Sequence, residues 1–119
     1  MLKSVCAGSI CFVLGMATLA YAQNQAELNQ ESKSDYEIAD AELNKVYKKL
    51  RVGMTDEEKS SLKEVQLLWL KYRDKNAEFA ASRYEGGSIA GMVYAGSLTS
   101  DTEDRVERLK GFFREGYEE

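Results

Sequence analysis

Apolar positions recur in steps of three and four along the middle of the chain, which is the spacing of one face of an α-helix. One such stripe lies between residues 36 and 50 and a second between residues 62 and 79. The stripe positions are Tyr36, Ala39, Leu43, Val46, Tyr47 and Leu50 in the first, and Leu62, Val65, Trp69, Tyr72, Asn76 and Phe79 in the second. No strand-like alternation competes with this spacing, so each stripe predicts a long helix.

Residues that start and stop helices separate these stripes. Gly53 follows a basic last turn and predicts the end of the first helix. Thr55 with Glu58 three residues later forms a capping-box pattern that predicts the start of the second. The pair Gly86-Gly87 interrupts the pattern again and predicts a loop after Tyr84.

Two further start signals follow that loop. Ser88 predicts a short helix, and the Ser100–Glu103 capping-box pattern predicts a last helix. The short helix carries Ile89, Met92 and Val93, and the last directs Val106, Leu109, Phe112 and Phe113 inward. We therefore expect an all-α fold, a small helical bundle of two long antiparallel helices closed by a short and a medium helix. Its expected core is Leu43, Val46, Leu50, Val65, Trp69, Tyr72 and Leu109.

The first 22 residues form a separate segment. Lys3 precedes an apolar or small run from Val5 to Ala20, and Ala20-Tyr21-Ala22 has the small-x-small form of a signal-peptidase site. The apolar run is shorter than the ~20 residues that a membrane span needs. We predict a secretory signal peptide over residues 1–22, one domain over residues 23–119, and a periplasmic or secreted protein without a membrane span after cleavage.

The amino-acid composition lacks the residues that most catalytic mechanisms use. The chain has no histidine, and both of its cysteines lie in the predicted signal segment. These absences exclude Ser-His and Cys-His nucleophiles, His or Cys metal sites and the usual general base. Acid pairs such as Asp56/Glu57 lie at predicted helix starts, where capping explains them. We expect no enzyme activity, no cofactor and no metal site, and loss of Lys3 takes the net charge from −4 to −5, which disfavours nucleic acid as a partner.

Four segments in order are similar to signatures of the LprI-type lysozyme-inhibitor family, over about residues 25–110. The first-helix segment is residues 39–50, and the second is Gln66-x-x-Trp69-x-x-Tyr72-Arg73-Asp74. Gly86-Gly87-Ser88-Ile89 and Thr102-x-x-Arg105-x-x-x-Leu109 resemble the closing segments. The residues that carry this resemblance are Leu43, Tyr47, Trp69, Tyr72, Arg73, Asp74, Thr102, Arg105 and Leu109.

The resemblance implies an exported, helical envelope protein that inhibits lysozyme or a related peptidoglycan hydrolase by stoichiometric occlusion. An immunity or adaptor protein that binds another envelope protein or toxin is the alternative. Family members usually carry cysteines where this chain has Glu31, Ala77 and Ser97. Their joint absence implies that a disulfide framework is missing, and that any surface depending on it is altered.

Each candidate residue has a structural and a functional interpretation. Trp69 and Tyr72 lie on the apolar stripe, which favours core packing over ligand stacking. Arg73 either pairs with Asp40 inside the protein or is offered to an acidic cleft of the partner. Lys45, Lys48 and Lys49 form a basic ridge, typical of a solvated helix face. Residues Gly86, Gly87, Ser88 and Ile89 form the candidate partner-binding loop, because exposed loops often carry function.

Overall fold

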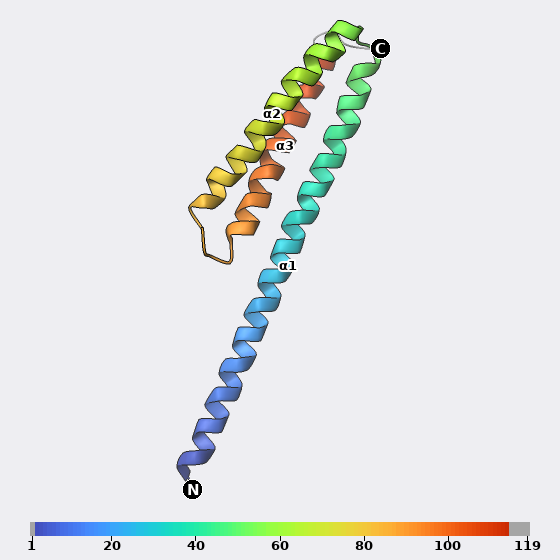
Figure 1. Cartoon of the computed structure of the whole chain (residues 1–119). Coiled ribbons are helices and arrows are strands. Elements are labelled where there is room, and N and C mark those ends of the chain that lie inside the picture. Colours follow the sequence, from blue (N-terminus) through green and yellow to red (C-terminus); the bar gives the residue numbers. More distant parts are fainter. Residues whose placement is uncertain (1, 115–119) are drawn as a thin grey trace.

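The structure is a computed structural model that describes the backbone of residues 2–114 and the side chains of residues 24–113. It contains three helices, α1 (Leu2–Val52), α2 (Asp56–Ser82) and α3 (Ala90–Arg114) (Figure 1). The all-α class expected from the apolar periodicity is confirmed. The side chains of the predicted export signal lie outside the described residues, so the signal and its cleavage site remain predictions.

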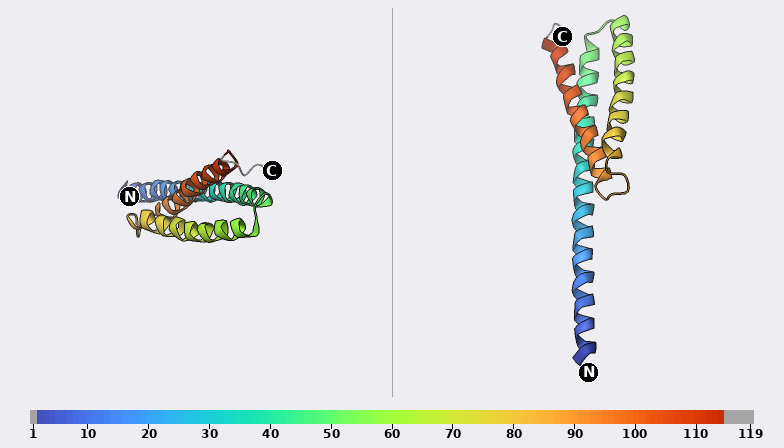
Figure 2. Two further views of the ribbon diagram at one scale, coloured as in Figure 1. Left: turned by 90° about the horizontal axis from the view of Figure 1, so that it is seen from above. Right: turned by 90° about the vertical axis from the view of Figure 1, so that its left-hand side faces the viewer.

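The three helices form an elongated bundle in which α3 holds the other two together. Helices α1 and α2 run antiparallel, and α3 packs against both, whereas α1 and α2 contact each other little (Figures 1 and 2). The molecule measures 85 × 25 × 18 Å because α1 continues well past the connection between α2 and α3. The central packing element is therefore the C-terminal helix.

The C-terminal segment differs from the expectation. The predicted short helix and the predicted medium helix are one continuous helix, α3. Ser100 lies inside it, and the Thr99 hydroxyl bonds the carbonyl oxygen of Ala95 at 2.9 Å, as Ser and Thr do within helices. At the start, Val93 N–H donates to the Ile89 carbonyl at 3.0 Å, which puts Ile89 rather than Ser88 at the cap. Both predicted serine caps were wrong: Ser88 lies in the loop one residue before the cap position, and Ser100 faces solvent within the helix.

The start of α2 agrees with its sequence signal. Thr55 has an extended backbone (φ −68°, ψ 165°), and its hydroxyl accepts a hydrogen bond from the Glu58 N–H at 3.2 Å. The same hydroxyl lies 3.2 Å from the Glu58 carboxylate. Asp56, Glu57 and Glu58 occupy the first turn, where the helix dipole favours negative charge. The capping residue and the acidic turn together fix where the second helix begins.

The core combines one face of each helix. Its buried cluster consists of Leu43, Val46, Leu50, Leu62, Val106 and Leu109, with Trp69, Phe112 and Phe113 packed against it. The predicted burial of Leu43, Val46, Leu50 and Leu109 is confirmed. The predicted burial of Val65 and Tyr72 is wrong, since these side chains are 51% and 59% exposed.

Helix α2 is rotated relative to the expectation. Its buried residues are Leu62, Gln66, Arg73 and Ala77, whose steps of four, seven and four residues place them on one helix face. The exposed side chains Val65 and Tyr72 lie roughly a third of a turn around the helix from this buried line. Polar residues occupy the buried line because they have partners inside the protein. Of the predicted apolar stripe, Leu62 is buried and Trp69 packs against the core, whereas Val65, Tyr72 and Phe79 are left on the surface.

Candidate partner-binding site

Arg73 joins α2 to α1 from inside the bundle. Only 7% of Arg73 is exposed, and its Nε and Nη2 atoms each lie 3.0 Å from Asp74 Oδ1. Nη1 lies 3.8 Å from Asp40 Oδ1 on α1, a separation that leaves attraction without a direct hydrogen bond. The side chain therefore has intramolecular partners on two helices and little surface to present to another protein.

Aromatic rings complete the surroundings of Arg73. Its guanidinium carbon lies 5.3 Å from the ring centre of Trp69 and 5.5 Å from that of Tyr36, within the range of cation–π attraction. Arg105 from α3 lies over Trp69 as well, at 5.8 Å. The Arg105 Nε also donates to Gln66 Oε1 at 2.9 Å, which links α3 to α2.

We call the four residues Gln66, Trp69, Arg73 and Arg105 the arginine layer. It connects all three helices through charged and aromatic contacts. Nearby on the same α2–α3 contact, the Asn76 amide donates to Asp101 at 2.8 Å. Gln66 and Arg73 lie on the same face of α2 as Leu62 and Ala77, so their spacing in the sequence already indicated the true buried face. It was missed because polar residues were assigned to the surface.

Burial changes the titration of two groups in or beside the arginine layer. Burial raises the pKa of the Tyr36 hydroxyl, and the nearby Arg73 charge opposes part of that rise. Burial likewise lowers the pKa of the Arg105 guanidinium, and the positive charge of Arg108 lowers it further. Both shifts follow from the cost of forming or keeping a charge away from water.

Among the predicted signature residues, Leu43 and Leu109 belong to the buried core, and Tyr47 packs against it. Thr102 is fully buried on α3, one turn before Arg105. Asp74 is held beside Arg73. Tyr72 is the exception, because it points away from the interior. The resemblance to the LprI family therefore rests mostly on residues that hold the helices together.

The candidate partner-binding loop lies at the end of the bundle remote from the α1–α2 turn (Figure 1). Gly86 has φ 79°, a conformation that favours glycine, and a Cβ at Gly87 would lie 3.0 Å from the Tyr84 carbonyl oxygen. Gly86, Gly87 and Ser88 are exposed, and Ile89 is half-buried. Among the described residues the Ser88 hydroxyl has no hydrogen-bond partner. The loop is thus a tight turn whose polar tip faces solvent.

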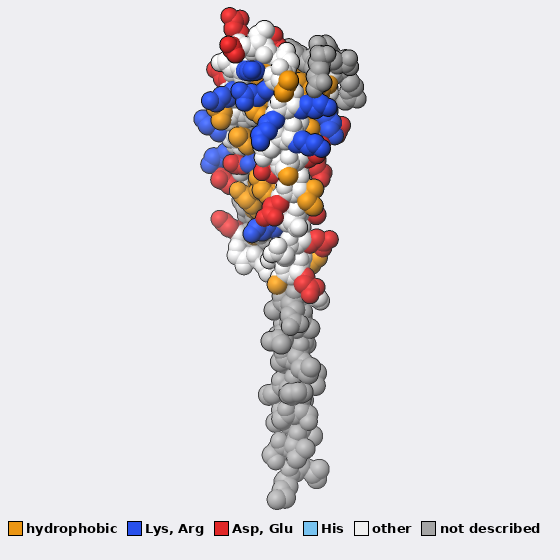
Figure 3. Space-filling view, turned by 90° about the vertical axis from the view of Figure 1, so that its right-hand side faces the viewer, with side chains coloured by type: hydrophobic (Ala, Val, Ile, Leu, Met, Phe, Trp, Pro, Cys, Tyr) orange, Lys and Arg blue, Asp and Glu red, His pale blue; other side chains and the backbone are white. Residues whose placement is uncertain are grey.

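The basic ridge lies near the other end of the molecule. Lys45, Lys48 and Lys49 are exposed on the last turns of α1, and Lys49 Nζ lies 5.6 Å from the ring centre of Phe113. Lys and Arg side chains gather over this upper part of the face shown in Figure 3. The structure does not bring the basic ridge and the candidate loop together.

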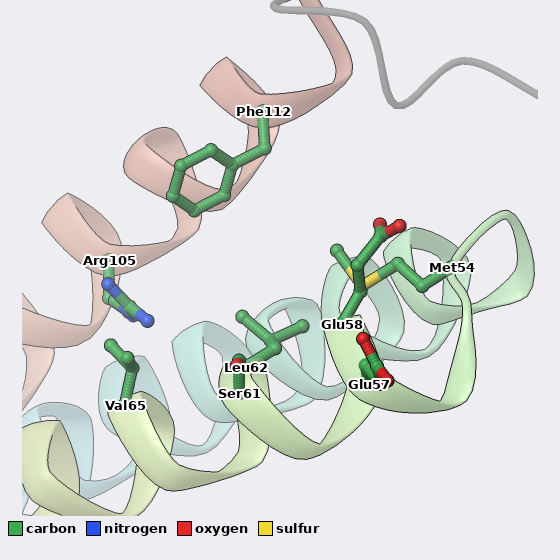
Figure 4. A pocket seen from close by; sticks show the side chains of 8 residues that line it. All are labelled: Met54, Glu57, Glu58, Ser61, Leu62, Val65, Arg105 and Phe112. Atoms are coloured by element: carbon green, nitrogen blue, oxygen red, sulfur yellow. The ribbon is translucent and has the colours of Figure 1, made fainter.

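A hollow with a volume of about 440 Å³ opens between α2 and α3. Its apolar lining is Met54, Leu62, Val65 and Phe112, and Glu57, Glu58, Ser61 and Arg105 complete it (Figure 4). Smaller grooves of about 370 and 380 Å³ follow α1 beside α2 and α3. Within the described residues no group of acidic side chains could hold a metal ion, and no helix is apolar enough over a sufficient length to cross a membrane.

The fold and its interior define a class, a small three-helix protein whose helices are joined by a buried arginine layer. Residues 16–109 match the family described as Lysozyme inhibitor LprI, and the chain belongs to that family. It is 36% identical over 102 residues to the uncharacterized protein R02472 of Rhizobium meliloti (strain 1021), which covers 75% of this chain and 73% of that protein. No solved structure matches the chain.

Proposed function

We propose that the protein is exported to the periplasm or the exterior and inhibits a lysozyme-type peptidoglycan hydrolase by stoichiometric occlusion. The observation that carries the proposal is family membership over residues 16–109, since that family is described by lysozyme inhibition. The composition supports a binding role, because the chain contains no histidine and its cysteines lie in the predicted signal segment. Occlusion requires no catalytic group on the inhibitor.

Charge supports the encounter. The chain carries 20 acidic and 16 basic side chains, and cleavage of the predicted signal would remove one of the basic ones, Lys3. A cationic hydrolase would be attracted at long range, and salt would screen that attraction. We therefore expect inhibition to weaken as salt rises from ~50 to ~300 mM, mainly through slower association.

We propose that the Gly86–Ile89 loop enters the catalytic cleft of the hydrolase. It is a narrow turn between two helices, whereas the helix faces are broad. The Ser88 hydroxyl is exposed and not engaged in a helix cap, so it is available to a partner. The arginine layer is an unsuitable contact, because Arg73 is buried and already paired.

A lysozyme activity assay with the processed protein tests this proposal. The loop variant carries Ser88→Glu and Ile89→Ala, which leave the Gly86 backbone conformation unchanged. The matched control reverses Lys45, Lys48 and Lys49 to Glu at the remote end. We expect the loop variant to weaken inhibition at least tenfold and the ridge variant to change it less. The opposite ranking would mean that the basic ridge is the binding face.

The absence of the family's usual cysteines favours a second candidate function, an immunity or adaptor protein for another envelope protein or toxin. If wild type fails to inhibit several lysozymes at micromolar concentration, the inhibitor proposal fails and this candidate replaces it. Affinity capture from an envelope extract, with a defined protein retained by wild type and lost from the loop variant, would support the replacement.

A further inference from the structure

An apolar stripe runs along the outer face of α2. Its members Val65, Leu68, Tyr72 and Phe79 are 51%, 63%, 59% and 64% exposed. Their spacing of three, four and seven residues places them on one helix face. Exposed apolar side chains gathered on one helix face mark an interaction surface more often than scattered ones do.

The charges beside this stripe are distributed unequally along α2. Glu57, Glu58 and Glu64 accompany its N-terminal half. Lys75 and Arg83 accompany its C-terminal half, where the Glu78 carboxylate lies 3.0 Å from Lys75 Nζ. Lys63 is in the N-terminal half too, but it lines the groove toward α1 on another face. The stripe therefore has an acidic half and a basic half, and the basic half is the weaker of the two because Glu78 partly neutralises Lys75.

The two halves of the stripe also differ in shape, because a hollow adjoins the acidic half and an exposed ring projects from the basic half. The acidic half adjoins the hollow of about 440 Å³ between α2 and α3, whose lining includes Met54, Leu62 and Phe112 (Figure 4). The small side chain of Ser61 stands at this hollow. The basic half carries the most exposed ring of the stripe, Phe79, with the Arg83 guanidinium 5.9 Å from its centre.

We propose that a second copy of this chain docks on the α2 stripe in an antiparallel arrangement related by a two-fold axis at the level of Leu70. At that level Leu68 faces Tyr72 of the second copy, and Glu64 lies close to its Lys75. Phe79 then faces Ser61 of the other copy and enters the hollow between α2 and α3. The basic half of each stripe meets the acidic half of the other.

Two comparisons select this occupant and this direction. A parallel pairing would place Glu64 beside Glu64 and Phe79 beside Phe79, and it would leave the hollow empty. A cationic hydrolase would be attracted to the acidic half of this face and repelled by Lys75 and Arg83, whereas a second, antiparallel copy brings opposite charges together over both halves. Two-fold symmetry presents the same patch twice, so a patch with opposite halves complements itself. This inference does not depend on the proposed inhibitor function.

The size of the patch sets the strength of the expected dimer. The four stripe side chains expose roughly 500 Å² per copy, below the ~800 Å² per partner of a standard interface. The flanking charges and the mouth of the hollow add contact area. We therefore expect a reversible dimer that forms at about 10–100 µM rather than an obligate one.

Sedimentation equilibrium of the processed protein, purified from cells that express the full-length chain, tests the dimer. Phe79→Glu should raise the dimer dissociation constant at least tenfold. Leu67→Glu is the matched control, because Leu67 is 52% exposed but lines the α1 side of α2. It should stay within twofold of wild type. A wild type that remains monomeric at ~200 µM, or equal effects of the two variants, would overturn the proposal.

A charge exchange tests the direction of docking. Glu64→Lys alone and Lys75→Glu alone should each weaken the dimer about three- to tenfold, because each places like charges opposite one another. A mixture of the two variants should restore wild-type affinity, because the introduced lysine at position 64 then meets the introduced glutamate at position 75. If the mixture is as weak as its components, the antiparallel arrangement is wrong.

Discussion

Replacing Arg73 separates a structural role from a partner-binding role. Arg73→Ala removes the Cγ and Cδ methylenes, which are worth up to ~1.6 kcal/mol when buried. It also removes two cation–π contacts, worth ~0.5–1 kcal/mol each. The ion pairs with Asp40 and Asp74 add little, since those carboxylate side chains are 40% and 50% exposed and return easily to water.

Removing the guanidinium also removes the desolvation cost of its buried positive charge, and this gain offsets part of the lost stability. We therefore expect Arg73→Ala to lower the free energy of unfolding by ~2–3 kcal/mol. Arg73→Met keeps most of the stem and removes the charge, so its cost should be ~1 kcal/mol or less. Urea denaturation followed by circular dichroism at 222 nm measures both variants.

The same variants distinguish the two interpretations of Arg73. Under the structural interpretation, Arg73→Met retains inhibition of whatever hydrolase the wild type inhibits. An Arg73→Ala protein within ~0.5 kcal/mol of wild-type stability that nevertheless loses inhibition would refute our reasoning, because it would show that the guanidinium reaches the partner.

Three further measurements follow from the packing. Trp69→Ala should lower the free energy of unfolding by ~2–4 kcal/mol through cavity formation. Tyr72→Ala, at a position 59% exposed, should change it by no more than ~1 kcal/mol. Similar losses for both variants in denaturant melts would contradict the rotation of α2. Thr55→Ala should cost ~1 kcal/mol by removing the cap of α2, and an unchanged midpoint would mean that the cap contributes nothing. Because burial raises the pKa of Tyr36, the folded state holds that proton more tightly, so its stabilising effect is present below pH 10 and declines as pH rises through the folded pKa. Tyr36→Phe should flatten that alkaline loss in melts above pH 10, and an identical decline in both proteins would exclude Tyr36 as its source.

Local sequence determined the helices themselves. Steps of three and four, the absence of proline and the Thr55 cap were enough to predict an all-α fold and the start of α2, because these effects act within a few residues. The burial of Leu43, Val46 and Leu50 also followed, since the stripe of α1 is its only apolar face in that region. Family membership was readable as well, because its signature residues keep their order along the chain.

Tertiary structure decided which face of α2 is buried and whether α3 is interrupted. Hydrophobicity alone favoured the Val65–Tyr72 stripe, but the interior contacts of Arg73 and Gln66 exist only once α1 and α3 are in place. Ser88 and Ser100 have the chemistry of caps, yet packing against both other helices allows α3 to continue through residue 100. Capping and solvent exposure are both open to a serine, and only the assembled bundle chooses between them.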